Sequence, residues 1–216
     1  MLLQLYGYFR SSAAYRVRIA LETKGLAWEN LPVHLLREGG EQFSPAYRAV
    51  NPEGLVPTLR DGGVLLSQSL AILEYLEETH PARPLLPPDA AGRALVRAMA
   101  AQIACDIHPL NNLRVLKYLE HRLGVSPEMR TEWIRHWIGE GFTALEARFA
   151  AQASPGRCCF GDTVTLADCC LVPQVLSARR FGVDMAAFAR IAAIDAYLCG
   201  LPAFQAAAPA AQWDAE

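Results

Sequence analysis

The strongest constraint on folding is a strand-like segment that runs directly into a helix near the start of the chain. Residues 2–8 are mostly apolar and typical of a strand, and Ser11 and Ser12 follow immediately. After Ser12 the apolar residues recur at helical spacing, at Ala13, Ala14, Val17, Ala20 and Leu21. Serine is a favoured helix N-cap because its hydroxyl satisfies backbone N–H groups of the first turn. Since that turn also stabilises anions, the junction is either an ordinary cap or a place to hold a thiolate or phosphate.

The composition is that of a globular protein. The 216 residues are enough for one or two domains, and 52% of them are hydrophobic and 19% charged. The net charge is −2 without a basic block, so we expect no nucleic-acid partner. No apolar run approaches the roughly 18 residues of a membrane span, and residues 1–6 do not resemble a signal peptide. We therefore expect no membrane partner and a cytoplasmic location.

The cysteines do not form a metal-binding pattern. They are Cys105, Cys158, Cys159, Cys169, Cys170 and Cys199. None stands in a C-x-x-C pair or at zinc-ligand spacing, so we expect no metal site. In a reducing compartment they are most simply buried small apolar side chains.

The first eighty residues alternate strand-like and helix-like segments. The expected strands are 2–8, 28–35, 55–59 and 64–66, and the expected helices are 12–24, 41–50 and a last one capped by Ser69. Gly25 is placed to end the first helix, and Asp61-Gly62-Gly63 predicts a hairpin turn. The order β-α-β-α-β-β-α implies a parallel first pair and an antiparallel hairpin.

A cluster of prolines marks a domain boundary, and helices follow it. Pro81, Pro84, Pro87 and Pro88 lie close together. Beyond them the apolar spacing is helical throughout. We therefore predict a first domain over residues 1–80, a linker over 81–90 and an all-helical domain over 91–216.

Three local patterns have a specific physical meaning. Pro57 cannot donate to a sheet ladder, so the Val56–Pro57 bond is either at an edge or cis. Gln68 and Ser69 stand at a second helix start that can bind an anion. The sequence from Thr165 to Asp168 is a capping-box pattern, which is structural rather than catalytic.

Together these patterns resemble a glutathione transferase, and the resemblance covers nearly the whole chain. The segment Ser11-Ser12-Ala13-Ala14-Tyr15-Arg16-Val17-Arg18-Ile19-Ala20-Leu21 is similar to the zeta-class signature S-S-C-x-x-R-V-R-I-A-L. The segment Cys105-Asp106-Ile107-His108-Pro109-Leu110-Asn111-Asn112 resembles bacterial members that isomerise maleylacetoacetate or maleylpyruvate. Ala13 stands where many members have cysteine, which argues against thiol-reductase chemistry by a protein cysteine.

The resemblance implies the glutathione transferase fold, a thioredoxin-like βαβαββα domain followed by an all-α domain. It also implies glutathione as the cofactor. Ser11 would stabilise the glutathione thiolate with support from Ser12. Val56, before a cis Pro57, would pair its backbone with the cysteinyl unit. The γ-glutamyl carboxylate would be bound by Gln68 and Ser69.

The second substrate implied by the family is a dicarboxylate, which needs cations. Arg10 and Arg180 are the candidates, and Arg180 can equally be a solvated charge at a helix end. His108, Asn111 and Asn112 have the spacing of one helix face. His108 and Asn112 are candidates to contact glutathione or substrate, and an inert histidine beside Pro109 is the alternative.

The function implied is a glutathione-dependent cis–trans isomerase that forms a homodimer. Two alternatives are enzymes, a general glutathione S-transferase and an α-haloacid dehalogenase, and a third is a non-catalytic glutathione-binding protein. Isomerisation leaves the glutathione concentration unchanged, whereas conjugation consumes glutathione. Loss of the thiolate-stabilising serine would favour the non-catalytic protein, but Ser11 and Ser12 are both present.

Overall fold

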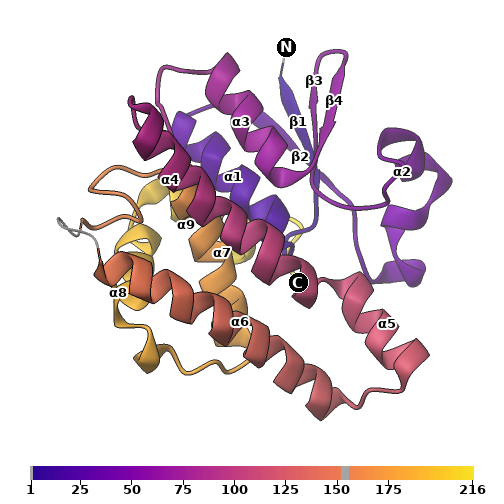
Figure 1. Cartoon of the computed structure of the whole chain (residues 1–216). Helices are drawn as coiled ribbons and strands as arrows, with labels where there is room; N and C mark the ends of the chain where they lie inside the picture. Colours follow the sequence, from indigo (N-terminus) through magenta and orange to yellow (C-terminus); the bar gives the residue numbers. More distant parts are fainter. Residues whose placement is uncertain (1, 152–155) are drawn as a thin grey trace. The chain divides into compact units, whose positions relative to one another are not determined.

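The computed structural model describes residues 2–151 and 156–216, which form two compact units (Figure 1). The first unit is Met1–Leu85 together with Gly200–Glu216, and the second is Leu86–Cys199. The sequence pattern placed residues 200–216 in the helical domain, whereas the structure groups them with the first unit.

The first unit contains a four-stranded mixed sheet. Its strands are β1 (Leu3–Gly7), β2 (Trp28–Pro32), β3 (Thr58–Asp61) and β4 (Val64–Ser67), and they lie in the order β2-β1-β3-β4. The β1–β2 pair is parallel and the β3–β4 hairpin is antiparallel, which confirms the predicted topology. Asp61 pairs with Val64 across a two-residue turn at Gly62-Gly63. The third strand was predicted over residues 55–59, but it begins at Thr58, directly after Pro57. Proline has no N–H group to donate to the ladder, so the strand starts only after it.

The helices of the first unit lie on both faces of its sheet (Figure 1). They are α1 (Ser12–Lys24), α2 (Pro45–Val50), α3 (Ser69–Thr79) and the short α9 (Pro202–Ala207). In Figure 1, α1 and α3 lie on one side of the strands and α2 on the other. The helix expected over 41–50 is broken, because Ser44 is extended (φ −61°, ψ 147°) and separates a 3₁₀ turn at Glu41–Phe43 from α2.

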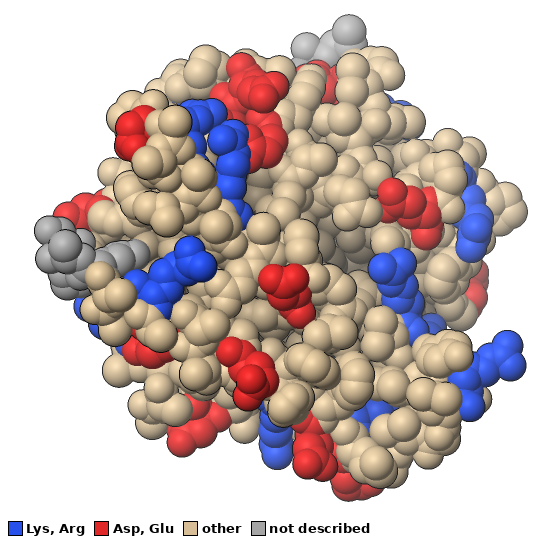
Figure 2. Space-filling model, viewed as in Figure 1, with Lys and Arg blue, Asp and Glu red and all other residues tan. Residues whose placement is uncertain are grey.

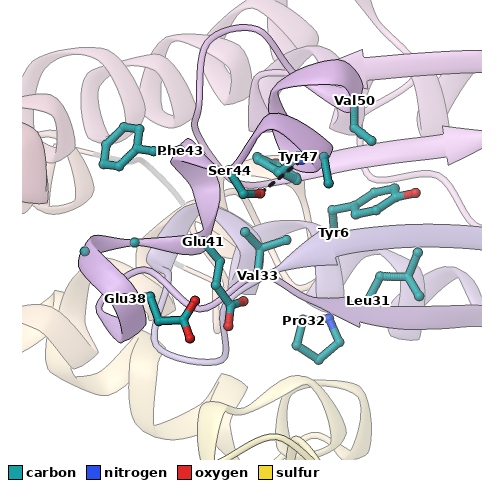
Figure 3. A pocket seen from close by; sticks show the side chains of 13 residues that line it. Tyr6, Leu31, Pro32, Val33, Glu38, Glu41, Phe43, Ser44, Tyr47 and Val50 are labelled. Carbon is teal, nitrogen blue, oxygen red and sulfur yellow. Dashed lines mark hydrogen bonds between the residues drawn. The ribbon is translucent and has the colours of Figure 1, made fainter.

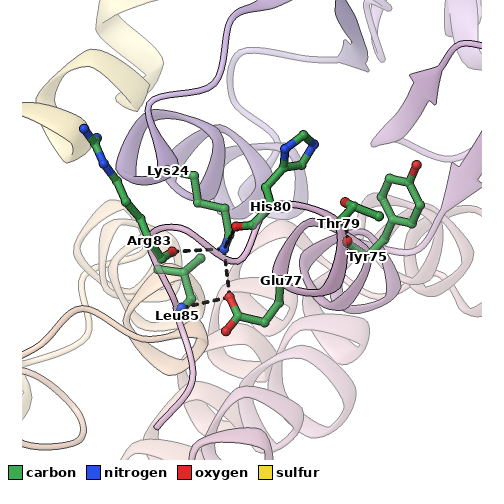
Figure 4. A network of polar contacts seen from close by, with 7 residues as sticks. All are labelled: Lys24, Tyr75, Glu77, Thr79, His80, Arg83 and Leu85. Carbon is green, nitrogen blue, oxygen red and sulfur yellow. Dashed lines mark hydrogen bonds and ion pairs between the residues drawn. The ribbon is translucent and has the colours of Figure 1, made fainter. Parts of the chain in front are cut away.

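A buried ion pair fixes the chain that follows α3 (Figure 4). Lys24 Nζ lies 2.8 Å from Glu77 Oε2, and both side chains are almost fully buried. Lys24 Nζ also donates to the carbonyl oxygens of His80 and Arg83, each at 3.0 Å. Glu77 Oε2 accepts from Leu85 N at 2.8 Å. These hydrogen bonds offset the desolvation of the two charges, so the pair holds the proline-rich segment against α1 and α3.

The C-terminal segment packs on α1, which explains its place in the first unit. Tyr15 Oη donates to the Phe204 carbonyl at 3.3 Å, and Arg18 Nε donates to the Ala207 carbonyl at 2.8 Å. Asn30 Nδ2, on β2, donates to Asp214 Oδ1 at 2.9 Å. Sequence periodicity cannot show such contacts, because they join residues far apart in the chain.

The regular elements of the second unit's described residues are all helical, as predicted. Its helices are α4 (Ala90–Ala101), α5 (Leu113–Leu123), α6 (Pro127–Ala150), α7 (Leu166–Arg180) and α8 (Ala189–Cys199). Most apolar positions that recur in α6 and α7 are buried, among them Phe142, Leu145 and Leu171, whereas Leu176 is exposed. Among the residues described in either unit, no helix combines the length and apolarity needed to cross a bilayer.

Charged side chains of both signs are mixed on the surface. On the face shown in Figure 2, Lys and Arg side chains lie among Asp and Glu side chains rather than in one block. The basic stripe that marks a nucleic-acid-binding surface is therefore not on this face.

Candidate active site

The turn between β1 and α1 places a serine hydroxyl at the start of a helix. Ser11 is the N-cap, with extended backbone (φ −69°, ψ 116°), and its Oγ accepts from Ala14 N at 3.2 Å. Ser11 N donates to the Tyr8 carbonyl at 2.8 Å, which fixes the turn, and Ser12 is the first helical residue. The first turn of α1 contains no acidic side chain. Because Oγ uses a lone pair for Ala14, the hydroxyl hydrogen remains available to donate to an anion.

The loop before β3 has the predicted cis peptide bond between Val56 and Pro57. Two side chains hold the preceding residue in place. Tyr47 Oη donates to the Leu55 carbonyl at 2.6 Å, and Asn51 Nδ2 donates to the same oxygen at 2.9 Å. The backbone of Val56 is therefore presented from a loop that is anchored on its N-terminal side.

The start of α3 differs from the predicted cap. The N-cap is Gln68 rather than Ser69, and Gln68 has a left-handed φ of 69°. Ser69 is the first helical residue and is buried, and its Oγ accepts from Arg16 Nη1 at 3.1 Å. The Gln68 amide Nε2 donates to Glu53 Oε2 at 2.8 Å. The prediction that Ser69 caps the helix was wrong, but the two residues do stand at a helix N-terminus, as expected.

Two arginines of α1 connect these features, and sequence reasoning missed their roles. Arg16 and Arg18 are both about 1% exposed. Arg16 contacts Ser69, and Arg18 Nη2 donates to the Phe9 carbonyl at 3.0 Å, just before Ser11. Burial lowers the pKa of Arg18 to about 10, so it remains a cation at neutral pH. Two arginines within an otherwise apolar helical segment were the available signal, since buried arginines require partners.

A cavity of about 650 Å³ lies beside α2 and is separate from these features (Figure 3). Tyr6 of β1 and Val33, which follows β2, line it, with Glu41 and Tyr47 from the segment that includes α2, and none of the predicted site residues does. Burial raises the pKa of Tyr47, whose hydroxyl is the group that holds the Leu55 carbonyl. This cavity therefore borders the support of the Val56 loop rather than the site itself.

In the second unit, His108 and Asn112 do not share a helix face. A π-helix over Gln102–Ile107 is followed by a 3₁₀ turn over His108–Asn111, and Asn112 is the extended N-cap of α5. Asn112 Oδ1 accepts from Arg114 N at 3.1 Å. The prediction of one continuous face was wrong because the helix geometry changes twice within this segment.

The π-helix is anchored at both ends by Gly141 of α6. Gln102 Nε2 donates to the Gly141 carbonyl at 3.2 Å. A Cβ atom built on Gly141 would lie 2.3 Å from two side-chain carbons of Ile107, the residue before His108. The absence of a side chain at Gly141 therefore allows Ile107 to pack closely against α6, one residue before the His108 turn.

The two candidate carboxylate-binding arginines are exposed and lie in different units. Arg10 follows β1, and its guanidinium lies 4.9 Å from the centre of the Phe9 ring. Arg180 is the last residue of α7 and lies 5.5 Å from the centre of the Phe181 ring. Its neighbour Arg179 is engaged with Asp195 at 2.8 Å. Arg10 and Arg180 therefore both keep a guanidinium accessible to a ligand.

Asp168 has the structural role that the capping pattern predicts. Its Oδ2 accepts from Thr165 N and Thr165 Oγ1, both at 2.7 Å, and its Oδ1 accepts from Cys159 N at 2.8 Å. Asp168 is fully buried, and burial raises its pKa while these hydrogen bonds oppose that rise. The carboxylate thus joins the start of α7 to the loop before it.

The cysteines divide into two groups. Four are buried, as predicted, and they are Cys158, Cys159, Cys169 and Cys170. Cys105 and Cys199 are exposed, so the prediction of burial was wrong for these two. Burial raises the pKa of Cys158 to about 12, which makes it a poor nucleophile.

Comparison with known proteins now identifies the family. A family model described as "Glutathione S-transferase, N-terminal domain" matches residues 5–84. A probable maleylacetoacetate isomerase of Vibrio cholerae is 53% identical over 215 residues, covering 100% of this chain and 99% of the relative. The chain belongs to the glutathione S-transferase family. A maleylpyruvate isomerase of Ralstonia is 50% identical to this glutathione S-transferase over 212 residues, covering 98% and 99% of the two chains.

Solved structures share the whole fold of this glutathione S-transferase. The holo structure of maleyl pyruvate isomerase, a bacterial zeta-class glutathione S-transferase, has a TM-score of 0.96 at 50% identity, covering 99% and 100% of the two chains. Maleylacetoacetate isomerase of Methylobacterium extorquens, with bound malonate and glutathione, has a TM-score of 0.94 at 42% identity and 99% coverage of each chain. The maleylacetoacetate isomerase of Anaeromyxobacter dehalogenans, with bound dicarboxyethyl glutathione and citrate, has a TM-score of 0.87 at 43% identity. The match covers 100% of this chain and 94% of that one.

Proposed function

We propose that this protein catalyses the cis–trans isomerisation of maleylacetoacetate or maleylpyruvate with glutathione as its cofactor. The observation that carries the proposal is Ser11, a hydroxyl at the N-terminus of α1 in a first turn without acidic side chains. Relatives about 50% identical over their full length are named maleylacetoacetate or maleylpyruvate isomerase, which supports this reaction over general conjugation or dehalogenation.

Ser11 would hold and ionise the glutathione thiol, with Ser12 beside it. When bound, glutathione supplies the thiolate that adds to the substrate double bond and leaves after rotation. A free thiol has a pKa of about 8.5, and helix N-termini and hydrogen-bond donors lower it. A shift of two pKa units corresponds to about 2.7 kcal/mol of thiolate stabilisation. The Ser11 hydroxyl and the macrodipole of α1 are the sources of that stabilisation in this chain.

Three further residues of the first unit would bind the rest of glutathione. Val56, from the loop held by Tyr47 and Asn51, would pair its backbone with the cysteinyl unit. Gln68 and Ser69, at the N-terminus of α3, would bind the γ-glutamyl carboxylate. The donors at these two helix ends fit a ligand that has a thiolate at one point and a carboxylate at another.

Arg10 and Arg180 would bind the carboxylates of the second substrate and stabilise charge on its oxygens. Both guanidinium groups are exposed, and malonate, a dicarboxylate, is bound in a relative of known structure. His108 and Asn112 are proposed to contact glutathione or this substrate from the segment that follows the π-helix. Substituting each residue distinguishes the two roles, because the affinity changes either for glutathione or for the dicarboxylate.

We also propose that the protein is a cytoplasmic homodimer. Each unit exposes apolar side chains that association could cover, namely Val64 and Leu65 on β4 of the first unit and Leu95 on α4 of the second. Light scattering during gel filtration measures the mass, and a monomer at micromolar concentration would refute the dimer.

The test of the proposed activity is to assay the purified protein with each maleyl substrate, with and without glutathione. We expect isomerisation that requires glutathione, and the substrate with the larger kcat/KM is the preferred one. Isomerisation at the same rate without glutathione, or no turnover of either substrate, would refute the proposal.

A further inference from the structure

Opposite charges flank the start of α3. On one side the buried Arg16 guanidinium donates to Ser69 Oγ at 3.1 Å. On the other side the Glu53 carboxylate accepts from Ser67 Oγ at 3.2 Å and from Gln68 Nε2 at 2.8 Å. The positive N-terminus of α3 reinforces the Arg16 side. Of the first two residues at this helix end, Ser69 therefore contacts a cationic group and Gln68 an anionic one.

This arrangement is unfavourable for a simple anion. A carboxylate bound at Gln68 and Ser69 gains from Arg16 and the helix end, but it is repelled by the nearby charge of Glu53. The γ-glutamyl end of glutathione differs from a simple anion because its α-carbon carries both a carboxylate and an ammonium. An acidic group beside a carboxylate site is complementary to that pair of charges.

We propose that Glu53 binds the α-ammonium of glutathione and makes the site selective for the zwitterionic γ-glutamyl end. The inference rests on the proposed binding of the γ-glutamyl carboxylate at Gln68 and Ser69. An ionised carboxylate has about four lone-pair positions, so Glu53 can keep its contacts with Ser67 and Gln68 and still accept from an ammonium.

The loop that includes Glu53 is held by its own hydrogen bonds. Glu53 N donates to Asn51 Oδ1 at 3.0 Å, and Gly54 N donates to the Asn51 carbonyl at 3.0 Å. Gly54 takes a left-handed φ of 62°, which a residue with a side chain would adopt only with strain. The Asn51 side chain also donates to the Leu55 carbonyl, so one residue positions both Glu53 and the strand that follows Val56.

The experiment measures the dissociation constants of two ligands by calorimetry. One is glutathione, and the other is its deaminated analogue, in which hydrogen replaces the α-ammonium. The variant is Glu53→Gln, which keeps the size of the side chain and its hydrogen bonds but removes the charge. The matched control is Glu29→Gln, because Glu29 Oε2 accepts from Gln4 Nε2 at 2.7 Å in an equally exposed pair on the sheet.

We expect Glu53→Gln to raise the dissociation constant of glutathione about three- to fivefold, which is the effect of losing an exposed ion pair. The same variant should bind the deaminated analogue as tightly as the unaltered protein does, or more tightly. Glu29→Gln should change neither constant. If Glu53→Gln weakens both ligands equally, or neither, the inference is overturned.

A second variant separates failure of this inference from failure of the proposed site. Ser69→Ala should weaken both ligands, because both keep the γ-glutamyl carboxylate. If Ser69→Ala weakens both while Glu53→Gln weakens neither, Glu53 does not recognise the ammonium but the proposed carboxylate site stands. If Ser69→Ala changes neither constant, the carboxylate is bound elsewhere and both proposals fall.

Discussion

Replacing Ser11 by alanine should raise the pKa of the bound glutathione thiol and slow isomerisation. Hydrogen bonds to charged groups are worth about 1.5–3 kcal/mol, which corresponds to a rise of about one to two pKa units. At a pH below the thiol pKa, the thiolate fraction and the rate should therefore fall about tenfold or more. Ultraviolet absorbance of the thiolate, titrated in the complex, gives the pKa, and the rate follows from the isomerase assay.

Ser11 is also a helix cap, so the substitution should cost about 0.5–2 kcal/mol of folding stability. Ser126 provides a matched control because its Oγ accepts from Met129 N at 3.2 Å, the same distance as in the Ser11 cap. Ser126→Ala should cost similar stability but leave the thiol pKa and the rate unchanged. If Ser11→Ala changes neither the pKa nor the rate, the thiolate is stabilised by Ser12 or by backbone donors instead.

Four other substitutions test separate roles. Asp168→Ala should destabilise the protein by about 2–4 kcal/mol in denaturant melts, because it leaves buried N–H groups unpaired, without changing glutathione affinity; a stable variant that binds weakly would contradict this. Arg10→Ala or Arg180→Ala should lower kcat/KM for the dicarboxylate by roughly 10- to 150-fold and change little for an uncharged electrophile; equal losses would instead assign the arginine to glutathione or the fold. Gly141→Ala should lower the free energy of unfolding by about 1–3 kcal/mol, because its Cβ clashes with the end of the π-helix. Gly139→Ala is the control and should be neutral or stabilising, because nothing lies near its added Cβ. Equal effects of the two substitutions would refute the clash.

The sequence predicted the parts of the fold that depend on local chemistry. The serine cap, Gly25 at the end of α1 and the Gly62-Gly63 turn each follow from what one residue type does to nearby backbone. The capping carboxylate of Asp168 belongs to the same class. Such features are encoded within a few residues, so periodicity and residue identity are sufficient to find them.

The errors arose where tertiary contacts decide the local geometry. Serine is a typical helix cap, but the hydroxyl of Ser69 accepts a hydrogen bond from the buried Arg16, and Gln68 is the cap instead. His108 and Asn112 do not share a helix face because a 3₁₀ turn with Pro109 at its start follows the π-helix, and that π-helix contacts Gly141, more than thirty positions away. Neither partner is detectable from the local sequence.

Only part of the candidate site was predictable from the sequence. The sequence placed Ser11 and the polar pair Gln68 and Ser69 at helix starts, and the structure has them there. The charges behind them, Arg16 and Glu53, were not found, because a charged residue in a single sequence is most simply a solvated one. Their roles follow from contacts that cross from α1 and the loop before β3 to the start of α3.

The central claim is that glutathione is a catalyst in this protein and not a reactant. The measurement that tests it most directly is to quantify free glutathione by chromatography while the enzyme converts a large excess of maleyl substrate to the fumaryl product. We expect many turnovers per glutathione and an unchanged glutathione concentration at the end. Consumption of one glutathione for each substrate molecule converted would contradict it and identify the reaction as conjugation.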